Sequence, residues 1–243
     1  MSLPPLSRLF QAMDATWTPK AIHKVGPWLV REDPGGGQRV AATTATREVN
    51  AAEIALAETA MRDLGQTCLF SLTPTDAALD KMLQDRGYEV VDPVLMIAAE
   101  ISEMALPDSK PLDAIPCALP LALQAEFWAH NGIGPGRLDV MARTSGPKAY
   151  LFSRHKDRPA GAAFVAVDDT IAMLHALCID PNNRRQNLAA RTMARAAIWA
   201  AENGANTLAV ATTRENLPAQ ALFTSLKMSV VGKYHYRRKT ENT

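Results

Sequence analysis

The chain has 243 residues, of which 47% are hydrophobic and 21% are charged, and its net charge is +1. This balance is typical of a globular protein with one large domain or two small ones. It provides no overall field that would favour nucleic acid or an acidic membrane surface. The cysteines Cys68, Cys117 and Cys178 are far apart, have apolar neighbours and lack the spacing of a metal site.

No apolar run is long enough to cross a membrane, and residues 1–20 lack the order of a signal peptide. We therefore expect a cytoplasmic protein with reduced, buried thiols.

The first hundred residues alternate between helical and extended patterns. A Gly-rich turn at 33–38 can end a hairpin or cradle a phosphate; no helix-forming run follows it directly, which favours the hairpin. In chain order we expect a short helix within 7–15, a strand at 26–32, that turn, a second strand at 39–46, an Ala-rich helix at 51–65, a strand at 67–74, a helix at 75–87 and one or two strands over 88–101.

A proline-rich segment separates this half of the chain from the second half. Residues 104–120 contain four prolines and predict an extended linker. After it we expect helices at 121–132 and 137–143, a β-meander over 148–180, a helix from 188 to Gly204, a strand at 206–213, a helix at 215–226 and a final strand or hairpin at 228–239.

Residues 174–201 read as a strand, a tight basic turn and a helix. The start of a helix presents unpaired backbone N–H groups and the positive end of the helix dipole. Arg184 and Arg185 add fixed charge and forked donors that suit phosphate oxygens. This turn is therefore expected to bind the pyrophosphate of a coenzyme.

The two halves of the chain resemble each other. The segment from Gly65 parallels the segment from Gly204, and residues 76–91 parallel residues 217–232. The order helix, glycine, strand, helix, strand thus occurs twice, at an offset of about 140 residues. Such a long period indicates a duplicated domain, although convergent α/β patterning could imitate it.

Residues 118–243 resemble the GNAT superfamily of N-acetyltransferases, which take the acetyl group from acetyl-CoA. The resemblance rests on the strand ending in LCIDP, on the turn RRQNLA at 184–189 and on the segment ENLPAQALF at 215–223. It implies an α/β fold of two tandem GNAT-like domains, each a mostly antiparallel twisted sheet flanked by helices. We expect a degenerate domain at 1–105, a linker at 106–117 and the coenzyme-binding domain at 118–243.

The resemblance also implies which residues bind acetyl-CoA. Backbone groups of the strand around Cys178 would pair with the pantetheine arm, and the turn would bind the pyrophosphate. Asn216 would contact the coenzyme or, equally, cap the following helix. The expected coenzyme-binding residues are Leu177, Cys178, Ile179, Arg184, Arg185, Gln186, Asn187, Leu188, Ala189, Asn216 and Phe223.

Two positions depart from the family pattern. Asn187 stands where the family prefers glycine, but asparagine is the residue that best tolerates left-handed dihedrals after glycine. Phe223 stands where many members have a tyrosine that is thought to protonate the departing thiolate, and phenylalanine has no proton to donate. In the first half Glu48 falls where Asn187 lies, and because carboxylates repel pyrophosphate we expect no coenzyme site there.

Three residues are candidates for acid–base chemistry. His175 shares a strand parity with Leu177 and Ile179, and arylalkylamine acetyltransferases of the same superfamily have a histidine at the matching place. It would help to deprotonate the acceptor amine, or else be a core residue. Tyr234 and Tyr236 are candidates for a replacement acid or for residues that line the cleft.

The expected reaction is direct attack of an amine on the thioester in a ternary complex. The acceptor would be an amine of a small molecule or a protein, and the chain would be a monomer or a homodimer. The alternative is a non-catalytic acyl-CoA binding or scaffold protein, which Asn187 and Phe223 motivate.

Overall fold

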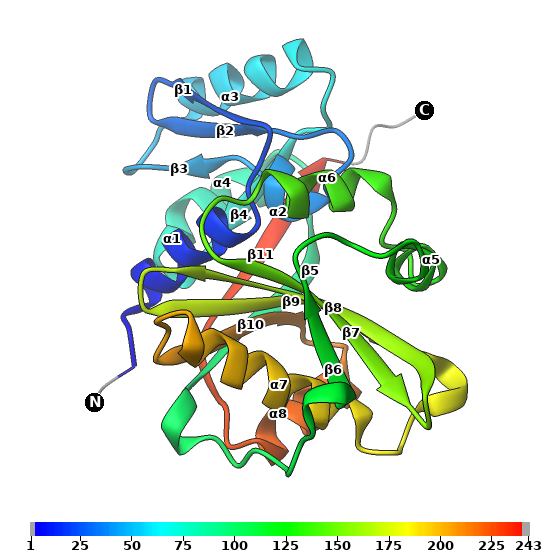
Figure 1. The fold of residues 1–243 in the computed structure, drawn as a ribbon. Helices are drawn as coiled ribbons and strands as arrows, with labels where there is room; N and C mark the ends of the chain where they lie inside the picture. Colours follow the sequence, from blue (N-terminus) through cyan, green and yellow to red (C-terminus); the bar gives the residue numbers. More distant parts are fainter. Residues whose placement is uncertain (1–2, 240–243) are drawn as a thin grey trace.

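The computed structural model describes residues 3–239 of the chain (Figure 1). Its helices are α1 (Leu6–Thr16), α2 (Gln38–Ala41), α3 (Ala51–Asp63), α4 (Ala77–Asp85), α5 (Ala122–His130), α6 (Pro135–Arg143), α7 (Leu188–Glu202) and α8 (Leu217–Ser225). Its strands are β1 (Ala21–Val25), β2 (Trp28–Glu32), β3 (Thr44–Ala45), β4 (Leu69–Leu72), β5 (Tyr88–Glu100), β6 (Ala114–Cys117), β7 (Lys148–His155), β8 (Arg158–Asp168), β9 (Ile171–Ile179), β10 (Thr207–Thr213) and β11 (Ser229–Lys239).

The strands form two sheets. A small sheet has the order β1-β2-β3, and a large one has the order β4-β11-β5-β10-β9-β8-β7-β6. All neighbours in these sheets are antiparallel except β9 and β10, which run parallel. A single parallel bridge between Thr43 and Phe70 joins the small sheet to β4. The expected fold class, a mixed and mostly antiparallel sheet flanked by helices, is therefore confirmed.

The two repeats exchange their last strands. The strands β4 and β5 of the first half correspond to β10 and β11 of the second half. Each pairs with a strand of the other half, since β5 is hydrogen-bonded to β10 and β4 to β11. The strands β5 and β11 also pair with each other, antiparallel, at the centre of this arrangement. The two halves are therefore joined through backbone hydrogen bonds and alternate within one sheet. The boundary expected near residue 105 stays a prediction.

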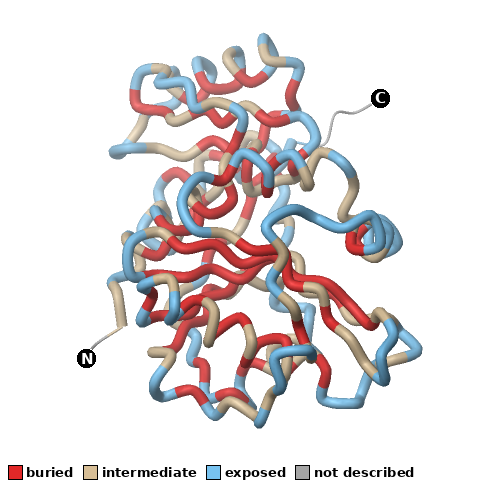
Figure 2. The backbone as a smooth tube through the Cα atoms, viewed as in Figure 1, coloured by how far each residue is buried: buried red, intermediate tan, exposed pale blue. Residues whose placement is uncertain are grey.

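Each face of the large sheet has its own hydrophobic core. The helices α7 and α8 cover one face, where alanines of α7 let the helix lie close to the strands. The helix α1 covers part of the other face, with Leu9, Ala12 and Met13 against β5, β9 and β11. Figure 2 shows the resulting continuous burial of the central strands. No helix within residues 3–239 is long and apolar enough to span a membrane.

The segment after the Gly-rich turn differs from the expected hairpin. The hairpin partner of β2 is β1, and the expected strand at 39–46 is present only at β3. The carboxylate of Asp33 accepts hydrogen bonds from the N–H groups of Gly35 and Gly36, at 3.2 and 2.6 Å. This closed turn directs the chain into α2 instead of a strand.

The proline-rich segment is also more ordered than a linker. Its last residues form β6, the edge strand of the large sheet, which pairs antiparallel with β7. A proline is tolerated there because an edge strand has one side without ladder hydrogen bonds. Residues 114–117 thus form a strand of the large sheet, and the linker expected at 106–117 stays a prediction.

Candidate active site

The parallel strands β9 and β10 pair only over their first residues and then diverge. The ladder runs from Ile171 opposite Thr207 to Leu174 opposite Val210. Beyond this point β9 continues along β8 while β10 continues along β5. The described residues offer no strand partner to the β10-facing edge of β9 after Leu174. A slot with available backbone groups therefore opens between the two strands.

A β-bulge at Ala176 reshapes β9 beside this slot. Phe164 lies opposite His175 and Ala162 lies opposite Cys178, so two residues of β9 face one residue of β8 between them. Ala176 has a φ of +53°, which places it in the left-handed region. The indole N–H of the buried Trp128 donates to the carbonyl of Ala176 at 2.8 Å and holds the bulge in place.

The bulge makes one sequence expectation wrong. His175 does not share a face with Leu177, because the extra residue at the bulge shifts the alternation of side chains. The imidazole packs beside the rings of Trp17 and Phe164, with centroid distances of 4.9 and 6.2 Å. Leu177 instead packs against the core under α7. Cys178 is buried on the side of His175.

The basic turn before α7 has the conformation expected of an anion site. Arg185 and Asn187 both have a φ of +58°, so asparagine does adopt the left-handed conformation here. Asn187 is the N-cap of α7, but its side chain caps none of the N–H groups of the first turn. Arg184 and Arg185 are exposed and form no ion pair with the described residues. The start of a long helix thus combines uncapped donors with two free cations.

The other predicted residues of this turn lie around it in different environments. Gln186 is exposed, and its carbonyl accepts a hydrogen bond from Arg191 at 3.2 Å. Ala189 is half-buried, whereas Leu188 is buried and anchors the helix start. Their contribution to the anion site is therefore through backbone groups.

The equivalent helix of the first half, α3, begins differently. Asn50 accepts hydrogen bonds from the N–H groups of Ala52 and Glu53, at 3.0 and 3.1 Å. The carboxylate of Glu53 accepts from the N–H of Asn50 at 2.9 Å and pairs with Arg47 at 2.6 Å. The protein's own side chains thus satisfy this helix start. The arrangement supports the prediction that the first half has no coenzyme site.

Two predicted coenzyme residues have structural partners of their own. The side chain of Asn216 caps α8 by accepting from the N–H of Ala219 at 3.2 Å. Phe223 is 5% exposed and packs in the core between the sheet and α7. Neither side chain reaches the cavity described next.

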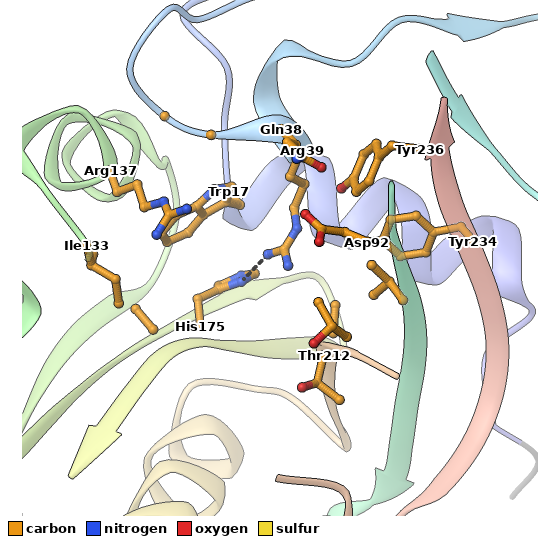
Figure 3. Close-up of a pocket in the computed structure, with 16 residues that line it drawn as sticks. Trp17, Gln38, Arg39, Asp92, Ile133, Arg137, His175, Thr212, Tyr234 and Tyr236 are labelled. Carbon is orange, nitrogen blue, oxygen red and sulfur yellow. Dashed lines mark hydrogen bonds between the residues drawn. The ribbon is translucent and has the colours of Figure 1, made fainter. Parts of the chain in front are cut away.

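A cavity of about 360 Å³ lies where β9 and β10 diverge (Figure 3). Both halves of the chain contribute to its wall, because β5 lies between β10 and β11. It is lined by Trp17, Gly36, Gly37, Gln38, Arg39, Asp92, Val94, Ile133, Arg137, His175, Ala176, Ala211, Thr212, Thr213, Tyr234 and Tyr236.

A chain of hydrogen bonds crosses the wall of this cavity. The guanidinium of Arg39 lies 3.1 Å from Nδ1 of His175, and Nε2 of His175 lies 3.0 Å from the hydroxyl of Thr16. The Thr16 hydroxyl donates to the carbonyl of Ala12 at 2.7 Å. Because a guanidinium can only donate, Nδ1 is the acceptor and Nε2 carries the proton. Both nitrogens of His175 are therefore engaged.

The surroundings keep His175 neutral. Burial, and secondly the positive charge of Arg39, hold the pKa of His175 well below its usual range. A neutral imidazole can accept a proton only through a free lone pair, and here Arg39 uses that lone pair. The structure thus brings His175 to the cavity, in an arrangement that favours orienting Arg39 over accepting a proton from an amine.

Both predicted tyrosines line the cavity. Tyr234 and Tyr236 are 2% and 4% exposed, and their rings form an edge-to-face pair with centroids 5.6 Å apart. Burial, and secondly the neighbouring Tyr234, raise the pKa of Tyr236 well above its usual range. The Tyr236 hydroxyl therefore keeps its proton at neutral pH.

Charged groups on opposite sides complete the cavity. Asp92 is an exposed residue with a φ of +43°, at an irregularity where β5 opposes β11. Figure 3 shows its carboxylate directed into the cavity. On the other side the guanidinium of Arg137, from α6, lies against the backbone of Gly37. A Cβ added to Gly37 would lie 3.2 Å from Nε of Arg137. Neither Asp92 nor Arg137 forms an ion pair with a residue that the structure describes.

The Gly-rich turn that precedes Arg39 is fixed to the second half of the chain. Asp33 forms an ion pair with Arg143 of α6. The backbone of Gly35 also lies close to Gly136, because a Cβ added to Gly136 would be 2.4 Å from the carbonyl oxygen of Gly35. No motif in the sequence distinguishes Arg39, Asp92, Arg137 or Trp17. The only signal for Arg39 was its position directly after the Gly-rich turn, which we assigned to a hairpin.

Comparisons with known proteins agree with this architecture. The profile of the acetyltransferase (GNAT) family matches residues 120–228. The uncharacterized N-acetyltransferase YobR of Bacillus subtilis (strain 168) is 23% identical over 237 residues, which cover 93% of this chain and 95% of YobR.

Solved structures are similar to the whole chain. A GCN5-related N-acetyltransferase from Kribbella flavida has a TM-score of 0.73 and 17% identity, covering 99% of this chain and 98% of its own. A tandem GNAT protein from the clavulanic acid biosynthesis pathway has a TM-score of 0.61 and 11% identity, covering 93% and 86%. At these identities the likeness concerns the fold. Residues 120–228 are thus similar to the acetyltransferase (GNAT) family, and the whole chain has the fold of these solved structures.

Proposed function

We propose that the protein is an N-acetyltransferase that transfers the acetyl group of acetyl-CoA to an amine. The observation that carries the proposal is the slot between β9 and β10, because it joins two features that the reaction needs. One end leads to the uncapped, basic start of α7, and the other opens into the cavity that Arg39 and His175 line.

The residues around the slot fit a phosphorylated coenzyme. The N–H groups of the first turn of α7, together with Arg184 and Arg185, would bind the pyrophosphate. The edge of β9 from Leu177 to Ile179 offers backbone groups to the amides of the pantetheine arm. The coenzyme supplies an activated acetyl thioester, and the protein contributes binding and orientation.

The cavity would hold the amine beside the end of the slot. The bulge at Ala176 lines this cavity, and its backbone N–H groups would stabilise the charge that develops on the thioester oxygen. The attacking amine must lose a proton, and Asp92 is a carboxylate of the cavity wall that has no ion-pair partner in the described chain. Tyr234 and Tyr236 contribute phenol side chains to the same wall.

The departing thiolate does not require an acid from the protein. A thiol has a pKa far below that of an alcohol, so the thiolate leaves readily. The burial of Phe223 in the core is thus compatible with turnover. The same residue motivates the alternative function, a non-catalytic acyl-CoA binding protein.

Calorimetric titration with acetyl-CoA tests the proposal, followed by an assay of thiol release with a broad panel of amines. We expect binding, and thiol release that depends on the amine. Binding without thiol release for every amine would favour the non-catalytic alternative, and absence of binding at millimolar acetyl-CoA would exclude both functions.

A further inference from the structure

Arg39 is a shielded cation without a carboxylate partner. Its Nε is shielded from solvent and has no hydrogen-bond partner, and no carboxylate within residues 3–239 lies at ion-pair distance from its guanidinium. Its guanidinium donates to the neutral His175 and faces the phenol oxygens of Tyr234 and Tyr236. Burying a charge without a partner costs free energy, so this arrangement leaves a strong unused donor at the cavity.

The two buried arginines among the described residues have acidic partners, whereas Arg39 is partly exposed. Arg31 pairs with Asp14 at 2.6 Å, and Arg237 pairs with Asp80 at 2.7 Å. Both of these arginines are less than 10% exposed. Among the described arginines Arg195 also has a shielded Nε and no ion pair, but only Arg39 of these two lines the cavity.

The surroundings of Arg39 hold its charge in place and facing the cavity. Its guanidinium carbon lies 6.0 Å from the ring centroid of Trp17, and His175 accepts from one of its terminal nitrogens. Burial lowers the pKa of Arg39, but the facing phenol oxygens of Tyr234 and Tyr236 outweigh this effect and raise it. Figure 3 shows the guanidinium at the centre of the cavity wall.

The remaining charges are separated across the same cavity. Arg137 is a second cation on the side of Trp17, and Asp92 provides a carboxylate on the side of β5. His175 is neutral because its pKa is held well below its usual range. The cavity thus contains two cations and one anion, a pattern that complements a molecule with a negative group and an amine.

We propose that the acceptor is a small primary amine that carries a carboxylate, as an amino acid does. This rests on the proposed function. The carboxylate binds Arg39, whose forked donors suit two carboxylate oxygens, with Arg137 adding positive charge. The amino group lies toward Asp92. A cavity of about 360 Å³ accommodates a molecule of this size beside the thioester.

The transfer balances without any further reactant. The ammonium group loses a proton to Asp92, which returns it to solvent. The free amine then forms a carbon–nitrogen bond to the acetyl carbon, the carbon–sulfur bond breaks, and its electron pair leaves with the sulfur. The resulting thiolate takes a proton from solvent, and the product is an N-acetylated carboxylate.

The experiment compares matched acceptors on the full chain. The panel consists of the proteinogenic L-amino acids and short ω-amino acids, each paired with its carboxamide and with the amine that lacks the carboxylate. Thiol release from acetyl-CoA gives kcat/KM, and calorimetry without acetyl-CoA gives the affinity for each member. For at least one amino acid of the panel we expect kcat/KM and affinity to be about 10- to 100-fold higher than for its carboxamide and for the amine without the carboxylate. This is the range expected for a hydrogen bond to a charged group.

Substitution of Arg39 tests the assigned contact. In Arg39→Gln we expect the advantage of the carboxylate over its carboxamide to disappear, while the affinity for acetyl-CoA stays within about twofold of the parent. Arg39→Lys keeps the charge but not the fork and should retain part of the advantage. Lys24→Gln removes a charge from the exposed strand β1 and is the control that leaves all values unchanged.

The outcomes separate this inference from the proposed function. Acetyl-CoA binding with equal or better use of amines that lack a carboxylate would overturn the inference and leave the acetyltransferase intact. Acetyl-CoA binding with no carboxylate bound more tightly than its carboxamide would also overturn it. Failure to bind acetyl-CoA would instead refute the proposed function, and the calorimetric comparison would still decide whether Arg39 recognises carboxylates.

Discussion

The guanidinium of Arg39 donates to Nδ1 of His175 across 3.1 Å, and this contact joins helix α2 of the first half to strand β9 of the second. It fixes the tautomer of His175 and occupies the lone pair that a general base would need. The histidine that the resemblance assigned to amine deprotonation thus lines the cavity in hydrogen-bond contact with Arg39.

The buried neutral His175 predicts that stability depends on pH. Its folded-state pKa is held well below its ordinary value of 6.5, firstly by burial. Below that value the unfolded chain takes up a proton that the folded chain does not, so the free energy of unfolding falls as pH decreases, by up to about 1.4 kcal/mol per pH unit for this group. Denaturant titrations between pH 7.5 and 5 measure the slope, which should be shallower in His175→Gln. Equal slopes would contradict the assignment of a neutral buried imidazole.

Charge reversal in the basic turn should weaken coenzyme binding. Arg184→Glu or Arg185→Glu replaces a cation at the start of α7 with an anion, and we expect the Kd for acetyl-CoA to rise about tenfold or more. Lys24→Glu makes the same change on the exposed strand β1 and should leave the Kd unchanged. Calorimetry at fixed ionic strength makes the comparison. Unaltered affinity in both turn variants would show that the turn is not the phosphate site.

The left-handed conformation of Asn187 predicts opposite effects for two substitutions. Asn187→Gly keeps a φ of +58° without strain and should change the free energy of unfolding by less than about 0.5 kcal/mol. Asn187→Val places a β-branched residue in this region and should cost about 1–2 kcal/mol. Asn182→Val is the control, because Asn182 is an exposed asparagine nearby in the chain that does not have a positive φ. A tolerated valine at 187 would argue against the left-handed turn.

The strand exchange predicts that the second half does not fold alone. Residues 118–243 lack β5, which supplies a hydrogen-bonded neighbour to both β10 and β11. We expect this fragment to show no cooperative thermal transition in circular dichroism. Co-expression of residues 1–105 with residues 106–243 supplies the missing strand and should restore it. A cooperative transition in the isolated fragment would show that each half is self-sufficient.

The contact between Gly35 and Gly136 predicts sensitivity to a single methyl group. In Gly136→Ala the added Cβ would lie 2.4 Å from the carbonyl oxygen of Gly35, so α6 and the Gly-rich turn that precedes Arg39 must separate. We expect a loss of about 1–3 kcal/mol in the free energy of unfolding and a higher KM for the amine. Gly134→Ala, where an added Cβ meets nothing within 4 Å, should lose less. Equal losses would point to backbone propensity as the cause.

Local signals in the sequence were sufficient for most elements of the fold. Gly65 and Gly87, each with a positive φ, end helices where the pattern predicted helix ends, and the repeat of helix, strand, helix and strand is present in both halves. The basic turn before α7 was recognisable because its arginines and its uncapped helix start are adjacent in the chain. Helix ends and tight turns are set by residues that are adjacent in the chain, so a short segment of sequence is sufficient to predict them.

The partners of the strands and the composition of the cavity depended on long-range packing. Whether β10 pairs with β11 or with β5 is decided by which backbone edges meet in the folded chain, and both strands have similar patterns. Arg39 belongs to a helix of four residues that no periodicity could predict, and it reaches the cavity because Asp33 and Gly35 are fixed to α6. The sequence by itself thus determined most elements and the basic turn before α7. Only the tertiary structure decided that a cation from the first half faces the cavity, because that position results from contacts between residues about 100 apart in the chain.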